Sequence, residues 1–122
     1  MSWARLTWYR EDGYDKVHPD DVSVIEPGVQ GRLVRLLDSD DPWQRVSLGK
    51  AVVRVHRSLL KEAPAPRFDY GARVKAIPPR TPVVGEIRSI RWHFVRGEPF
   101  YLLSITGKPD ASRYWSHELS DA

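Results

Sequence analysis

Residues 85–90, Gly-Glu-Ile-Arg-Ser-Ile, decide the fold, because residues 31–36, Gly-Arg-Leu-Val-Arg-Leu, repeat their pattern of a glycine with aliphatic residues at the third and sixth positions. A Gly-Lys pair and then a leucine follow each copy, at Gly49-Lys50 and Leu59 and at Gly107-Lys108 and Leu119. Matched positions are 54, 58 and 60 residues apart, and the differences fall in turn-rich segments that tolerate insertions. Repetition at this period predicts two copies of one small structural unit.

Residues 63–66, Ala-Pro-Ala-Pro, separate the two copies. Alternating proline favours an extended, stiff segment. We therefore expect two domains, residues 1–62 with an N-terminal extension and residues 63–122 with this linker. Units of about 60 residues bury only about 60% of their unfolded surface and are marginal alone, so we expect the two to pack closely. The alternative is one larger mixed β domain whose repeat is accidental.

Short runs of alternating or β-branched residues between turn residues predict about four strands in each half. The expected strands are residues 5–9, 31–37, 43–48, 51–55, 68–77, 85–94, 100–105 and 113–115. Single helical turns are expected at residues 56–60 and 116–119, and residues 21–25 fit either a helical turn or a strand. Small all-β units usually close into barrels, because open strand edges invite aggregation.

The second half carries a family resemblance. The run Phe68-x-x-Gly71-x-x-Val74, followed by a loop, Gly85-x-Ile87, a hairpin and a closing turn, resembles the SH3-like barrels of bacterial small domains and of the Tudor and KOW groups. The first half is similar but lacks the Gly-x-x-Val entry. Over roughly residues 20–120 the resemblance implies an all-β fold of two SH3-like barrels in tandem, with a short N-terminal extension and short helical turns. Such barrels carry many functions.

The opening of the chain is also similar to that of an uncharacterised bacterial family, through Trp8-Tyr9 and His18-Pro19-Asp20-Asp21. That resemblance implies no particular activity. The N-terminus lacks the apolar core of a signal peptide, and no run approaches the roughly 18 apolar residues of a membrane span. We therefore expect a cytoplasmic protein with no membrane contact.

The composition narrows the chemistry. With no cysteine among its 122 residues, the chain has no disulfide, thiolate metal site or cysteine nucleophile. It lacks the phosphate-binding, nucleophile-elbow and zinc-protease motifs, so we predict neither an enzyme nor a cofactor. Residues 18–21 fit either a metal or general-base cluster or a helix cap. Residues 38–41 lack the Gly and terminal Glu of a calcium loop, which favours a turn.

The second half holds a surplus of aromatic residues and arginine. Residues 63–122 carry nine Lys or Arg against six Asp or Glu, whereas residues 1–62 carry ten of each. Alternate residues of a strand face opposite sides, so not all of these side chains fit one small core. Three interpretations compete: packing between the barrels, a groove for a protein partner, and a stacking and phosphate-binding surface for nucleic acid. The candidate partner-binding residues are Arg91, Trp92, His93, Tyr101, Arg113 and Trp115.

The resulting functional prediction is a non-enzymatic protein-binding module. A bacterial adaptor or toxin-immunity protein that covers its partner is a specific form of this prediction. The alternative is an RNA- or DNA-binding module that uses the basic, aromatic second barrel.

Overall fold

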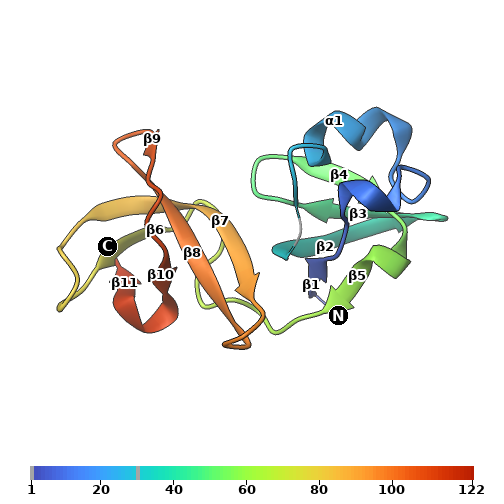
Figure 1. Ribbon diagram of the computed structural model, residues 1–122. Helices are drawn as coiled ribbons and strands as arrows, with labels where there is room; N and C mark the ends of the chain where they lie inside the picture. Colours follow the sequence, from blue (N-terminus) through green and yellow to red (C-terminus); the bar gives the residue numbers. More distant parts are fainter. Residues whose placement is uncertain (1, 30) are drawn as a thin grey trace. The chain divides into compact units, whose positions relative to one another are not determined.

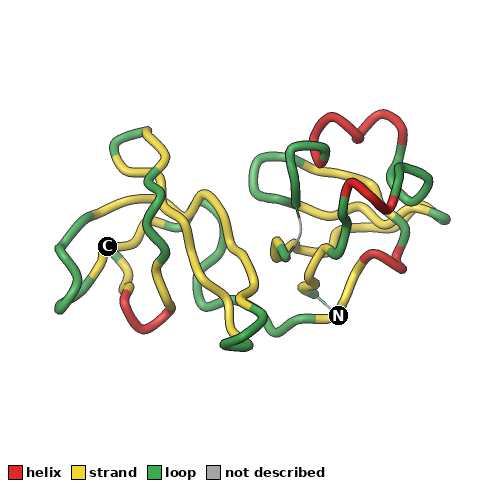
Figure 2. The backbone as a smooth tube through the Cα atoms, viewed as in Figure 1, coloured by secondary structure: helices red, strands yellow, loops and turns green. Residues whose placement is uncertain are grey.

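The computed structural model describes residues 2–29 and 31–122. The chain divides into two compact units, Met1–Ala65 and Pro66–Ala122 (Figure 1). Most regular structure is strand (Figure 2). Within the described residues α1 (Val22–Ile25) is the only α-helix, and the other helical segments are 3₁₀ turns. The predicted all-β class is therefore confirmed. No helix in residues 2–29 and 31–122 is long and apolar enough to cross a membrane.

The first unit is an antiparallel sheet with helical turns in its connections. Its strands pair in the order β5-β1-β2-β3-β4. The strands are β1 (Trp3–Leu6), β2 (Arg32–Asp40), β3 (Trp43–Ser47), β4 (Val52–Val55) and β5 (Leu60–Glu62). Besides α1, the helical segments are the 3₁₀ turns η1 (Arg10–Asp12), η2 (Pro19–Asp21) and η3 (Arg57–Leu59).

Alternate residues of the strands form the core of the first unit. Val53 and Val55 on β4 are fully buried, whereas Arg54 between them is only half-buried. The long connection from β1 to β2 adds Trp8, which is 1% exposed and whose Nε1 donates a hydrogen bond to the carbonyl of Gly13 at 2.8 Å. The connection is therefore held by the core as well as by its helical turns.

The second unit repeats this order. Its strands pair as β11-β6-β7-β8-β10, and the short β9 pairs with the end of β8. The strands are β6 (Arg73–Ala76), β7 (Val84–His93), β8 (Glu98–Ile105), β9 (Lys108–Pro109), β10 (Tyr114–Trp115) and β11 (Leu119–Asp121), with η4 (Ser116–Glu118) before β11. In each unit, therefore, a 3₁₀ turn leads into the final strand, which pairs with the first.

Strand register defines which residues of the two units correspond. Leu60 and Leu119 each follow the final 3₁₀ turn and pair with Leu6 and Ala76, respectively. Leu119 therefore corresponds to Leu60, and the predicted match with Leu59 is one residue off. Both leucines are buried, so the pattern identified the right place in the fold.

The predicted equivalence of Gly31 and Gly85 is wrong. Ala4 lies two residues before Leu6, and Val74 lies two residues before Ala76, so these two positions correspond. Ala4 pairs with Val34, whereas Val74 pairs with Gly85. Gly85 therefore corresponds to Val34. Gly31 precedes β2 with a φ of 76°, a conformation that favours glycine. Gly85 lies within β7, where a Cβ would come 2.7 Å from the carbonyl oxygen of Ser104. The two glycines thus meet different steric requirements.

Other local predictions had mixed outcomes. Residues 21–25 form helical structure, and the predicted turns at 56–60 and 116–119 are η3 and η4. Of the predicted strand 68–77 only Arg73–Ala76 is a strand, and β1 begins earlier than the predicted 5–9. The strands β5, β9 and β11 were not predicted, because two or three residues show no periodicity.

Candidate partner-binding site

Three aromatic side chains of the second unit form a cluster on neighbouring strands. His93 ends β7, Phe100 lies in β8, and Trp115 ends β10, where it pairs directly with Phe100. Ring centroids are 5.3 Å apart for His93 and Trp115, 5.9 Å for Phe100 and Trp115, and 6.2 Å for His93 and Phe100. All three pairs are edge-to-face, the favoured geometry for aromatic contacts. We call these three residues the aromatic cluster.

Two guanidinium groups lie on the faces of these rings. The Arg96 Cζ is 3.6 Å from the Trp115 ring centroid, and the Arg113 Cζ is 4.9 Å from that of Phe100. The Arg96 guanidinium also lies 3.5 Å from the carboxylate of Glu98, and the backbone N–H of Arg96 donates to His93 Nδ1 at 3.1 Å. Each cation–π contact of a partly exposed pair contributes about 0.5–1 kcal/mol.

The cluster is half open to solvent. Phe100 is buried at 7% exposure, but His93 and Trp115 are only half-buried, and Arg113 is exposed. The Arg96 side chain is 42% exposed. A surface that combines a rigid aromatic base with accessible guanidinium donors can contact an aromatic or carboxylate group of a partner.

Glu118 in η4 holds the end of β10 in place. Its carboxylate accepts the backbone N–H of Trp115 at 2.9 Å and a bond from Arg80 at 3.1 Å. Arg80 also donates to the carbonyl of Arg113 at 3.0 Å and lies over the ring of Tyr114. Burial opposes ionisation of Glu118, but the Trp115 N–H and the Arg80 guanidinium outweigh it, and the pKa of Glu118 lies below its usual 4.5.

The six predicted site residues do not share one environment. His93 and Trp115 belong to the aromatic cluster, and Arg113 lies on it. Tyr101 is fully buried, and its hydroxyl accepts the backbone N–H of Arg67 at 3.0 Å. Tyr101 is therefore a core residue of the second unit, and its inclusion among the surface residues is corrected. It alternates with Phe100 along β8, which turns its ring to the interior.

Arg91 and Trp92 lie beside the cluster on β7. Arg91 is half-buried opposite Phe100, and its Nε lies 3.4 Å from the hydroxyl of Ser89. Trp92 is half-buried opposite Pro99. Sequence reasoning missed Arg96, which lies between the expected strands 85–94 and 100–105, and gave no role to Glu118. Arg96 acts on Trp115 through a tertiary contact, for which the local sequence carries no signal. Glu118 acts through a local contact with the backbone N–H of Trp115, so the three-residue spacing typical of a helix-capping pair was a signal that could have found it.

The first unit has an aromatic group at the corresponding position. The pair of Gln44 and Val55 corresponds to the pair of Tyr101 and Tyr114. Trp43 therefore occupies the position of Phe100, and His56 occupies the position of Trp115. The Trp43 ring centroid lies 5.0 Å from that of His56 and 5.1 Å from that of His18. Both units thus carry a half-buried aromatic group at this end of the third strand.

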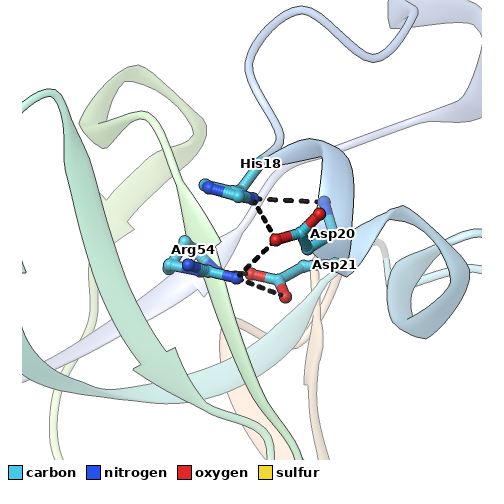
Figure 3. A network of polar contacts seen from close by, with 4 residues as sticks. All are labelled: His18, Asp20, Asp21 and Arg54. Atoms are coloured by element: carbon cyan, nitrogen blue, oxygen red, sulfur yellow. Dashed lines mark hydrogen bonds and ion pairs between the residues drawn. The ribbon is translucent and has the colours of Figure 1, made fainter.

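A polar network fixes the His18 side of this group (Figure 3). The Nδ1 of His18 accepts the backbone N–H of Asp20 at 3.1 Å and caps η2, which confirms the predicted helix start. Asp21 is 9% exposed and accepts bonds from the backbone and guanidinium of Arg54, and the hydrogen bonds from that guanidinium lower its pKa. Within residues 2–29 and 31–122, no three His, Asp or Glu side chains converge as a metal site.

An open pocket of about 340 Å³ in the second unit lies elsewhere. Arg73, Glu86 and Thr106 are among its lining residues, and none of the aromatic cluster is. This pocket is therefore separate from the aromatic cluster.

Fold and site together define a small all-β protein of two antiparallel units with an aromatic group at corresponding positions. The chain belongs to the family of unknown function DUF6960, whose model matches residues 1–120. The match spans both units, so the family is defined over the pair, and the expected membership of an uncharacterised family is confirmed. No curated protein and no solved structure matches the chain.

Proposed function

We propose that this chain is a non-enzymatic protein-binding module built from two SH3-like barrels, the second of which contacts the partner. Two features support the barrel assignment. Both units pair the final strand with the first, in the orders β5-β1-β2-β3-β4 and β11-β6-β7-β8-β10. In both, a single 3₁₀ turn, η3 or η4, precedes that final strand.

The proposal rests on the position of the Arg96 guanidinium over the ring of Trp115. The Arg96 Cζ lies 3.6 Å from the ring centroid. Trp and Arg are enriched among the residues that dominate the binding energy of protein interfaces, at well-packed sites that binding desolvates. Stacking leaves guanidinium N–H donors at the ring edge that can reach a partner's carboxylate. Residues 66–122 carry nine Lys or Arg and six Asp or Glu, so an acidic partner surface fits best. An adaptor or toxin-immunity protein would act through such a contact.

The test is affinity capture from the native cell with the full chain and three variants. Trp115→Ala and Arg96→Ala each weaken capture of the same partner by about tenfold or more, the scale of an interface hot spot. The matched control is Lys75→Ala, an exposed charge on β6 that leaves capture unchanged. If Trp115→Ala and Arg96→Ala retain the partner and lose only stability, both are packing residues and the proposed surface is wrong.

The same arrangement supports a second candidate, a nucleic-acid-binding module. Aromatic rings stack on bases, and arginines on their faces contact phosphates. This alternative requires affinity for a single-stranded oligonucleotide that falls steeply with salt, because phosphate contacts release counterions. Fluorescence anisotropy at about 50 mM salt decides it, since undetectable binding of DNA and RNA there removes the alternative.

A further inference from the structure

The ring of Trp43 differs from that of Phe100, its counterpart in the second unit, in what lies on it. Phe100 carries the Arg113 guanidinium, and its neighbour Trp115 carries that of Arg96, which also faces the carboxylate of Glu98. Trp43 contacts two imidazoles, and in the described part of the chain no guanidinium or ammonium group lies over its ring. The corresponding aromatic position of the first unit thus lacks the cation that the second unit supplies from its own chain.

Exposed carboxylates lie on the segments next to Trp43. Asp40 is its cross-strand partner at the end of the β2–β3 hairpin, and Asp41 is in the turn between them. Both are exposed, and the Asp20 side chain beside His18 is 77% exposed. The segments 15–21, 38–45 and 54–57 carry six Asp against four Lys or Arg, whereas segments 91–100 and 113–118 around the aromatic cluster carry three Arg against two Glu.

The arginines nearest to Trp43 are already engaged. Arg54 binds Asp21 through Nε at 2.9 Å, and Arg45 on β3 is paired with Asp38. Arg54 also attracts the carboxylates of Asp20 and Asp40, but in the described part of the chain neither arginine lies over the Trp43 ring. The first unit thus holds an aromatic ring at the start of β3 with exposed carboxylates on the adjoining hairpin and, within the described residues, no guanidinium over that ring.

We propose that Trp43, together with Asp40 and Asp41, binds an arginine or lysine side chain from a basic peptide segment of a protein partner. The ring face attracts the cation, and the hairpin carboxylates bind its N–H groups. Arginine is preferred, because its planar guanidinium stacks on the ring and pairs with a carboxylate at the same time. The site is independent of the partner-binding role proposed for the second unit, and the protein then contacts basic and acidic groups through different units.

The test uses the full chain, ¹⁵N-labelled, and the peptide acetyl-Gly-Arg-Gly-Arg-Gly-amide. The Trp43 indole N–H signal, assigned with Trp43→Phe, shifts in a saturable way with this peptide and not with its Glu counterpart. Trp43→Leu, which leaves the charge unchanged, weakens binding at least about threefold. Asp40→Asn weakens it about twofold. The matched control is Glu62→Gln, which removes one exposed charge on β5 and leaves the affinity unchanged.

Three outcomes would overturn the proposal. If Glu62→Gln weakens binding as much as Asp40→Asn, the peptide responds only to net charge. If Trp43→Leu folds and keeps full affinity, the ring is not part of the site; if it does not fold, the comparison of Asp40→Asn with Glu62→Gln decides. If sedimentation equilibrium shows self-association that both Trp43→Leu and Arg96→Ala abolish, the cation comes from a second copy of the chain and not from another protein.

Discussion

The carboxylate of Asp21 is bound by both the backbone and the side chain of Arg54, through the N–H at 2.8 Å, Nε at 2.9 Å and Nη2 at 3.2 Å (Figure 3). Asp21 ends η2 in the long connection after β1, and Arg54 lies in β4. One buried carboxylate therefore attaches this connection to the sheet and positions His18 against Trp43. Residues 18–21, whose sequence also fits a metal or general-base cluster, therefore hold this connection in place.

Replacing Asp21 destabilises the first unit. Asp21→Ala lowers its free energy of unfolding by about 2 kcal/mol, because the N–H of Arg54 loses a charged acceptor inside the fold. Asp20→Ala, at a side chain 77% exposed, changes it by less than about 0.5 kcal/mol. Urea denaturation followed by hydrogen exchange of β4 amides measures both. Equal losses for the two variants would contradict the anchoring role.

Acid weakens both units. The folded pKa values of Asp21 and Glu118 lie below their ordinary 3.8 and 4.5. A carboxylate with a lowered folded pKa contributes stability above its unfolded pKa and loses it as pH falls through the folded value. The melting temperature therefore falls below about pH 4, while these two groups leave it flat between about pH 6 and 8. Thermal unfolding at pH 7, 5 and 3 measures this, and Glu118→Gln removes part of the acid sensitivity of the second unit.

The correction of Tyr101 from surface to core is testable. Tyr101→Phe keeps the ring, which packs edge-to-face on Phe68, but removes the acceptor of the Arg67 N–H. We expect the second unit to lose about 1 kcal/mol of unfolding free energy, with partner capture unchanged. Chemical denaturation and the capture assay give the two readings. If Tyr101→Phe loses partner capture at unchanged stability, the hydroxyl contacts the partner and the assignment of Tyr101 to the core is wrong.

Gly85 and Gly107 meet different steric requirements, so we expect their substitution by alanine to lower the free energy of unfolding by different amounts. Gly85→Ala places a methyl 2.7 Å from a backbone carbonyl of β8, so the strands must separate, and we expect a loss of about 3 kcal/mol. Gly107→Ala meets open space but holds a φ of 78°, which costs about 1 kcal/mol. Denaturation midpoints at unchanged m-value compare them. A larger loss of unfolding free energy for Gly107→Ala would contradict this prediction and show that β8 shifts readily to accommodate a methyl group at position 85.

Sequence reasoning succeeded where a residue's role is local. The alternation of β3 and the Val-rich β4 predicted strands, and a proline after His18 predicted a helix start. It did not predict β5 or β11, because three-residue strands exist only through pairing with β1 and β6. In the candidate site it found His93, Arg113 and Trp115 from composition, and missed Arg96 because a turn residue gives no local sign of the ring it covers.

The sequence by itself determined the all-β class, the repetition and the unequal charge of the two halves, because periodicity, turn residues and composition act locally. Only the tertiary structure decided that Gly85 corresponds to Val34, that Tyr101 is core, and that Trp115 lies under a guanidinium whereas Trp43 does not. Register, burial and ring contacts depend on which strands pair, and pairing joins residues that the chain keeps far apart.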